Sequence, residues 1–126
     1  MKRETRGLLH KASRAIRAAE TLRQTEDLDF AAGRAYYAMF YAAEALLVER
    51  GLQFRRHGGV HAAFGEHFVK TGLLDTKLHR WLLDAFDRRI LADYGVEAIP
   101  SDEDVAGLIE HAREFLEAVP NQLERT

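Results

Sequence analysis

The sequence predicts an all-α protein, an up-and-down four-helix bundle with one short additional helix. Apolar residues recur at three- and four-residue steps along most of the chain, and no run alternates with the two-residue period of a β-strand. The two prolines, Pro100 and Pro120, fall where these helical patterns are expected to break or end. At 126 residues and 14.3 kDa, the chain is expected to form one helical domain spanning residues 1–126.

The first two predicted helices form a long antiparallel pair. The first is expected over residues 4–24, because leucine, isoleucine and alanine recur on one of its faces. The second opens after Asp27 or Asp29, since either carboxylate can act as N-cap. It runs to Arg50, and Gly51 then takes the position after the helix C-terminus, where glycine is favoured.

Three further helices are expected in the second half of the chain. A short one spans about residues 59–70 and stops at Gly72, and a longer one covers about residues 76–93. The last begins at Ser101, whose hydroxyl can cap a first turn that carries three acidic residues. We expect this helix to end before Pro120.

The second helix is too apolar for an ordinary surface helix. One apolar stripe contains Phe30, Tyr37 and Tyr41, and a second contains Tyr36 and Phe40. Such a helix is either central to the bundle or shared with a second copy of the chain. A bundle of this size seldom encloses one helix fully, so we favour a homodimer interface, with a simply well-buried helix as the alternative.

Composition excludes several classes of protein. The chain contains no cysteine, which excludes disulfides, thiol catalysis and cysteine-based metal sites. No apolar run is long enough to span a membrane, and no signal-peptide core follows the charged N-terminus, so a cytoplasmic location is expected. The net charge of −2 combines −6 over residues 97–126 with +4 over residues 1–96. Fourteen of the eighteen basic residues are arginine, which suits bidentate phosphate contacts.

An arginine interrupts the inward stripe of the fourth predicted helix. This stripe runs through leucine, alanine and phenylalanine to Arg89 and then Asp93, one turn further on. A charge on an apolar face needs a partner, and Asp93 can provide it, with the hydroxyl of Tyr94 close by. Arg88 instead lies four residues after Asp84 and is expected to form a surface ion pair. The Arg89–Asp93 pair is either a structural contact or part of a functional site.

The segment entering the third helix combines basic residues with glycine. Arg55, Arg56 and the following glycine pair precede a helix N-terminus, an arrangement that can bind phosphate or another anion. His57 and His61 also have the four-residue spacing of a metal-binding pair, with Glu66 or His67 following. There is no HExxH motif, and the glycine pair interrupts the helical pattern, so we expect no metal site. The alternative to a functional site in this segment is a helix-capping loop with two surface histidines.

The ordered set of motifs resembles the HEPN domain family (higher eukaryotes and prokaryotes nucleotide-binding), in particular its small stand-alone prokaryotic branch. The most distinctive segment is Gly33-Arg-Ala-Tyr-Tyr-Ala-Met-Phe-Tyr-Ala-Ala-Glu-Ala-Leu-Leu47. Together with the segments that follow it, the resemblance covers nearly the whole chain. Those segments are 57–60 with Phe64, 68–72, 89–94 and 112–116.

This resemblance implies a helical bundle that forms homodimers and is often encoded beside a minimal nucleotidyltransferase as a toxin–antitoxin pair. Active members of the family are metal-independent endoribonucleases with an Arg-x(4–6)-His motif on a later helix. Two copies of the motif face one another across the dimer, and the ribose 2′-OH attacks the neighbouring phosphate. Arginine stabilises the charge developing on the phosphoryl oxygens, and histidine moves the proton. No cofactor is implied.

Matching that motif to this chain gives Arg89 as its arginine, while Asp93 and Tyr94 stand in place of its histidine. Aspartate is ionised at neutral pH, so it can position or deprotonate a 2′-OH but is a poor acid. His57 can supply the missing imidazole if the third helix begins at the cleft. The resemblance also marks Tyr94 as a candidate for nucleotidylation by the partner enzyme. Further candidates for RNA or phosphate contacts are Arg34, Arg55, Arg56 and Arg88.

Two functions therefore remain open. The first is an RNA-directed or nucleotide-binding member of a toxin–antitoxin-like pair, whose cleft contains Arg89, Asp93, Tyr94 and His57. The second is a non-catalytic subunit that binds substrate for a nucleotidyltransferase or regulates it. In that protein the Arg89–Asp93 pair is structural. A bare structural dimer is a weaker third possibility.

Overall fold

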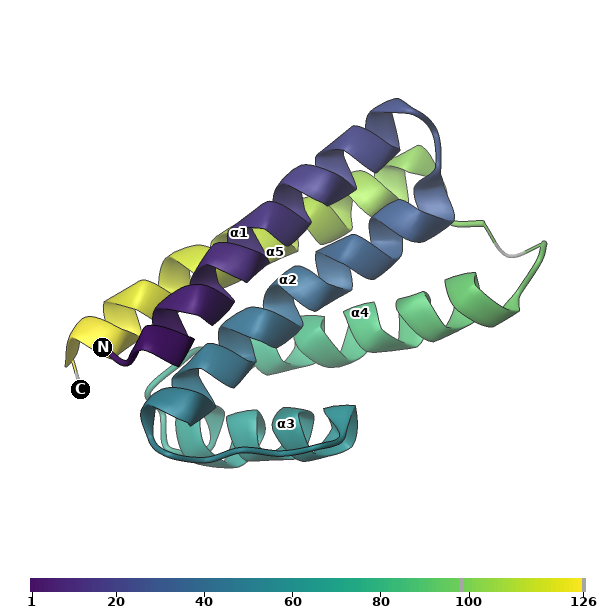
Figure 1. Cartoon of the computed structure of the whole chain (residues 1–126). Coiled ribbons are helices and arrows are strands. Elements are labelled where there is room, and N and C mark those ends of the chain that lie inside the picture. The colour runs from purple at the N-terminus through teal and green to yellow at the C-terminus, as the bar shows by residue number, and fades with distance from the viewer. Residues whose placement is uncertain (98, 126) are drawn as a thin grey trace.

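The structure, a computed structural model, describes residues 1–97 and 99–125, with the side chains of residues 1–97 and 99–123; Ala98 and Thr126 lie outside the described residues. Its long helices run in alternating directions (Figure 1). This part of the chain contains no strand, which confirms the all-α prediction. None of its helices is long and apolar enough to cross a membrane. The elements are α1 (Arg3–Gln24), α2 (Leu28–Glu49), α3 (His57–Phe64), the π-helical turn η1 (Gly65–Val69), α4 (Thr76–Tyr94) and α5 (Asp102–Arg125).

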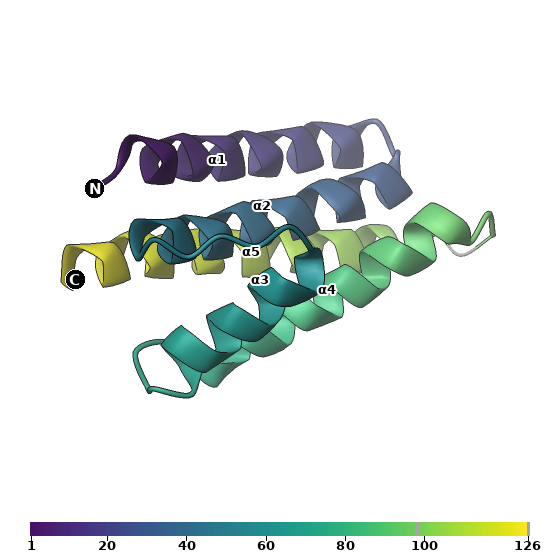
Figure 2. The same cartoon turned by 60° about the horizontal axis from the view of Figure 1, so that its bottom comes forward.

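Helix α2 forms the centre of the molecule. Figures 1 and 2 show α1 and α5 beside it, with α3 and α4 on the side of α2 away from α1. Fourteen of its 22 residues are buried, and its alanines let the neighbouring helices approach closely. The stripe that contains Tyr36 and Phe40 is buried within one chain, whereas in the other stripe Phe30 is exposed and Tyr37 and Tyr41 are half-buried. One chain therefore covers one stripe fully and the other only in part, and the homodimer interface stays a prediction.

Glycines and caps end most helices where the sequence predicts. Gly51 and Gly72 have φ angles of +78° and +80°, the left-handed conformation that side chains with a Cβ rarely adopt. At the start of α5 the Ser101 hydroxyl accepts a hydrogen bond from the Asp104 amide at 3.0 Å, as predicted. Asp27 precedes α2 but does not cap it. Its carboxylate accepts a hydrogen bond from the Thr25 hydroxyl instead.

Two predicted helix boundaries are wrong. The third helix begins at His57 instead of residue 59, so Gly58 and Gly59 lie in its first turn. A Cβ on Gly59 would lie 3.1 Å from Phe54, so the close packing of the preceding loop accounts for glycine here. The last helix does not end before Pro120 but continues to Arg125. Proline removes one helical hydrogen bond there, and the buried side chains on either side of it, Val119 and Gln122, hold the helix against the core.

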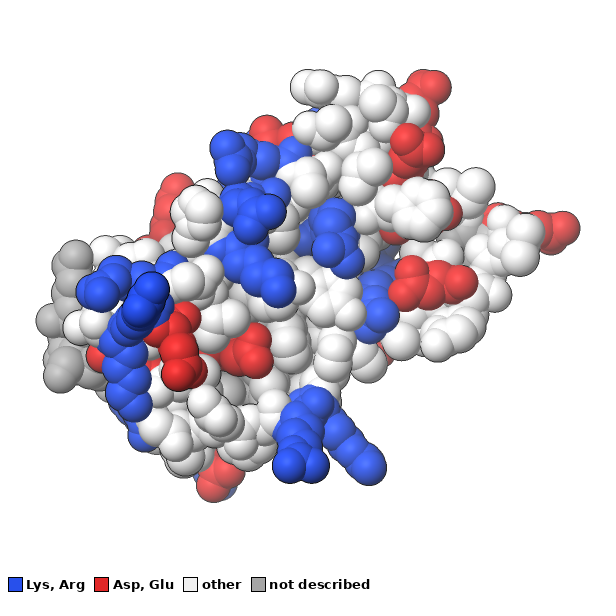
Figure 3. Space-filling model, in the orientation of Figure 1, with Lys and Arg blue, Asp and Glu red and all other residues white. Residues whose placement is uncertain are grey.

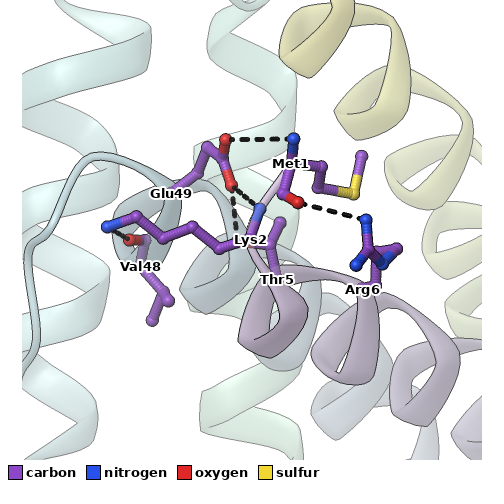
Figure 4. Close-up of polar contacts among 6 residues, drawn as sticks. All are labelled: Met1, Lys2, Thr5, Arg6, Val48 and Glu49. Carbon is purple, nitrogen blue, oxygen red and sulfur yellow. Dashed lines mark hydrogen bonds and ion pairs between the residues drawn. The ribbon is translucent and has the colours of Figure 1, made fainter.

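A polar cluster fastens the start of α1 to the end of α2 (Figure 4). The Glu49 carboxylate accepts hydrogen bonds from the Lys2 amide and the Thr5 hydroxyl, each at 2.8 Å. These donors hold the pKa of Glu49 below its usual range. The Lys2 ammonium donates to the Val48 carbonyl oxygen at 3.1 Å. The cluster fixes the ends of the two helices relative to each other and lies away from the site described below.

Candidate functional site

Two histidines from α3 converge on a tyrosine of α2. The Tyr36 hydroxyl lies 2.8 Å from Nδ1 of His57 and 2.7 Å from Nε2 of His61. The two histidines are four residues apart, so one helical face presents both to the same atom. The spacing considered for a metal pair thus brings the two imidazoles together around a hydroxyl. Within the described residues, no group of three or more acidic or histidine side chains is arranged to hold a metal.

Aromatic rings enclose this histidine pair. The His57 ring stacks on Phe40 with ring centroids 4.5 Å apart, and Phe86 of α4 lies 4.9 Å from the His61 ring. Tyr36 and His61 are buried, whereas His57 is half-buried. The packing fixes all three rings, and His57 is the member of the group that solvent reaches most.

Burial sets the protonation of the group. Burial lowers the pKa of His61 to about 4. The nearby His57 and His79 lower this pKa further, whereas the Asp87 charge raises it. Burial also lowers the pKa of His57, with the Arg89 charge as a second cause, and raises the pKa of the Tyr36 hydroxyl. Both imidazoles are therefore neutral at pH 7. The single hydroxyl proton of Tyr36 can be donated to only one of them, so the other must donate to the hydroxyl oxygen.

Arg89 lies against α2 beside the same group. Its Nε forms an ion pair with the Asp93 carboxylate at 3.0 Å, which confirms the predicted pairing. The guanidinium carbon is 5.0 Å from the centre of the Tyr37 ring and 5.9 Å from that of Tyr36. The Arg89 side chain is 23% exposed, so aromatic rings support the guanidinium while part of it faces solvent. Its ion pair uses Nε, so the two terminal nitrogens remain available to a ligand.

The structure places His57 and Arg89 close together. The Tyr37 ring centre is 5.7 Å from the His57 ring and 5.0 Å from the Arg89 guanidinium carbon. Three of the four predicted catalytic residues, Arg89, Asp93 and His57, therefore share one site.

The fourth, Tyr94, does not join them. Tyr94 is 81% exposed, and among the described residues no hydrogen bond, ion pair or ring contact joins its side chain to Arg89 or His57. Arg88 turns to the other side of α4, where it pairs with Asp84 at 3.0 Å and approaches Asp104 of α5 at 3.8 Å. The predicted Arg88–Asp84 pair is confirmed, and it separates Arg88 from Arg89.

The remaining predicted phosphate contacts lie on either side of the site. Arg55 and Arg56 are exposed in the segment directly before α3. Arg34 of α2 reaches the Tyr37 ring, with its guanidinium carbon 4.8 Å from the ring centre. Arg34 and Arg89 thus meet at one tyrosine ring, although 55 positions separate them in the sequence.

The structure adds residues to the site that the sequence did not single out as functional. Lys11 and Arg14 of α1 join Arg34 and Tyr41 around a shallow hollow of about 150 Å³. Figure 3 shows basic side chains gathered over α1 and α2 on this face. Spacing could have marked Lys11 and Arg14 as neighbours on one helix face. Their position beside α2 depends on how the two helices pack.

The fold and this site define a small helical protein that sets an arginine–carboxylate pair beside an aromatic-enclosed histidine. The chain belongs to the HEPN family, because the model of the HEPN domain matches residues 5–122.

Several relatives match this chain over most of their own length. Putative toxin MJ0142 of Methanocaldococcus jannaschii is 36% identical over 115 residues, which is 91% of this chain and 78% of that protein. A UPF0332 protein of Thermotoga maritima is 38% identical over 114 residues, 90% of this chain and 86% of the relative. Putative toxin MJ0605 of M. jannaschii is 30% identical over 123 residues, 98% of this chain and 91% of the relative.

Proposed function

We propose that this chain is the RNA-directed, toxin-like member of a pair with a minimal nucleotidyltransferase, and that it acts as a metal-independent endoribonuclease in a homodimer. The observation that carries the proposal is the meeting of Arg89 and His57 around Tyr36 and Tyr37. It supplies an imidazole beside the motif arginine although the motif histidine is absent. Two relatives that bear the name putative toxin support the toxin-like role.

Each group has a defined task in the reaction. The neutral His57 imidazole takes the proton of a ribose 2′-OH while the 2′-oxygen attacks the adjacent phosphorus. The P–O5′ bond breaks, and the departing 5′-oxygen takes a proton from water or from the imidazolium. Arg89 stabilises the charge on the phosphoryl oxygens, and Asp93 holds its guanidinium through Nε. The products are a 2′,3′-cyclic phosphate and a 5′-hydroxyl.

The competing function is a non-catalytic subunit that binds substrate for a nucleotidyltransferase or regulates it. It is favoured by the Arg89–Asp93 ion pair, which can be purely structural, and by the exposure of Tyr94. Tyr94 is 81% exposed and therefore accessible to a nucleotidylating partner, whereas Tyr36 is fully buried.

Incubation of RNA with the purified protein in EDTA tests the proposal. The wild type and an Arg80→Ala control, which removes an exposed arginine from the opposite side of α4, should cleave RNA and leave 2′,3′-cyclic ends. His57→Ala should lose about 10²-fold or more of the rate, as is typical for a general base, and Arg89→Ala should be at least as damaged. The rate should rise with pH and level off below the ordinary histidine pKa of about 6.5.

The opposite result is equally clear. If the wild type leaves every RNA intact in EDTA, at every pH tested, while still binding a nucleotidyltransferase partner, the catalytic function is excluded. Nucleotidylation of the wild type but not of Tyr94→Phe would then establish the regulatory alternative.

A further inference from the structure

Between its two ends, the central helix reaches the surface along one stripe. Between residues 31 and 48, the described residues of α2 that are not buried are Arg34, Tyr37, Tyr41 and Glu44. They follow one another at three- and four-residue steps, so they form a continuous line along the helix. Figure 1 shows α2 with α1 on one side and α4 on the other, and the rings of the stripe contact Lys11 of α1 and Arg89 of α4.

Basic side chains flank this line of rings from three helices. The Tyr37 and Tyr41 rings stack with centroids 5.6 Å apart. Arg34 and Arg89 reach the Tyr37 ring at 4.8 and 5.0 Å, and Lys11 of α1 lies 4.7 Å from the centre of the Tyr41 ring. Each ring of the stripe therefore has a basic side chain beside it, Arg89 of α4 and Arg34 at Tyr37 and Lys11 of α1 at Tyr41.

The positive charge on this stripe is largely uncompensated. Among the side chains that the structure describes, no ion pair involves Lys11, Arg14 or Arg34. Two carboxylates mark its ends. Asp93 pairs with Arg89, and Glu44 lies near Lys11. Burial raises the pKa of Glu44, and the Lys11 charge opposes part of that rise. Between these two carboxylates lies the 150 Å³ hollow, which Lys11, Arg14 and Arg34 line.

We propose that this stripe is a track for single-stranded RNA that leads from the Arg89 site across α2 to the hollow on α1. Phosphates contact the cations, and unpaired bases lie against the Tyr37 and Tyr41 rings. A duplex presents no base faces for such contacts, so single strands are favoured. The inference rests on the proposed RNA-directed function and extends it from one phosphate to a short run of nucleotides.

Binding of a fluorescein-labelled 2′-O-methyl octauridylate, followed by anisotropy at several salt concentrations, tests the track. The methyl group removes the nucleophile, so cleavage does not interfere. The test variant is Lys11→Ala/Arg14→Ala. The matched control, Lys70→Ala/Arg80→Ala, also removes one lysine and one arginine, from exposed positions in η1's C-terminal cap and in α4.

The test variant should bind at least tenfold more weakly than the control. Its slope of log K against log salt should be shallower by about 0.7 for each phosphate that the variant no longer neutralises. Tyr41→Leu should weaken binding without changing the slope, since it removes a ring and no charge. A duplex of the same length should compete poorly.

Three results would overturn the inference in distinguishable ways. If the wild type binds the octamer and the test variant binds it equally well, the track is wrong while the proposed function survives. If octaglutamate displaces the RNA at equal charge concentration, the stripe recognises acidic chains in general and not RNA. If the wild type binds no octamer at all, the proposed RNA-directed function fails together with the track.

Discussion

The Tyr36 hydroxyl holds two histidine side chains in place. The ring of Tyr36 is fully buried against α4, and its hydroxyl satisfies one nitrogen on each of two imidazoles. A buried polar atom without a partner would cost about 1–3 kcal/mol, so all three groups depend on one another. This mutual dependence fixes the His57 ring beside Arg89.

The stability of the protein should depend on the protonation of His61. The pKa of His61 is about 4 in the folded protein, against about 6.5 in an unfolded chain. Between these values the unfolded state binds a proton that the folded state does not. The free energy of unfolding should therefore fall as the pH drops from about 6.5 to about 4, by up to about 3 kcal/mol.

Urea unfolding at pH values between 7.5 and 4 measures this effect. In His61→Gln the amide can still hydrogen-bond to Tyr36 but does not titrate, so the decline should be shallower than in the wild type. His10→Gln, which replaces an exposed histidine, should follow the wild-type profile. Equal slopes in all three proteins would contradict a buried neutral His61.

At the scale of elements, the turn between α1 and α2 contains a residue under backbone strain. Glu26 has a φ of 64°, and it occupies the left-handed position of a Schellman motif. Its amide bonds to the Arg23 carbonyl oxygen at 3.0 Å, and the Asp27 amide bonds to that of Leu22 at 2.9 Å. Only glycine adopts this conformation without a steric cost.

Replacing Glu26 by glycine should therefore stabilise the protein by about 1 kcal/mol. Thermal or urea unfolding measures the change. The matched variant Glu26→Ala removes the same charge but keeps a Cβ, so it should show little of the gain. If alanine stabilises as much as glycine, the loss of charge and not the relief of strain is responsible.

At the scale of the whole molecule, exposed apolar side chains gather where α4 ends. Leu91, Val96 and Ile99 are 62%, 93% and 60% exposed, and Phe30 is 62% exposed at the start of α2. Figures 1 and 2 place the start of α2 beside the end of α4, so these side chains share one end of the bundle. Such clustering favours this end as the contact surface of the proposed homodimer.

A double variant, Leu91→Glu/Val96→Glu, should convert a dimer into a monomer, because it places four negative charges across a two-fold contact. Sedimentation velocity measures the change. The control Leu73→Glu alters an apolar side chain, 41% exposed, ahead of α4 and should remain dimeric. A monomeric wild type at micromolar concentrations would contradict the homodimer.

Local rules in the sequence predicted most of the fold. Helical spacing, the Ser101 cap and the left-handed glycines Gly51 and Gly72 each depend on near neighbours in the chain. The rules failed at Gly59 and Pro120, where packing against distant residues outweighs the local preference of glycine and proline. The Arg89–Asp93 pair was also predictable, because both residues lie one turn apart on one helix.

What the sequence alone determined about this protein is its all-α class, its helices and the pairing of charges within one helix. Only the tertiary structure decided that His57 and Arg89 lie against one tyrosine ring, that His61 shares the Tyr36 hydroxyl, and that Lys11 lies over Tyr41. The physical reason is the separation in sequence over which each kind of interaction acts. Hydrogen bonds and spacing within a helix act over four residues, whereas these contacts depend on how α1, α3 and α4 pack around α2.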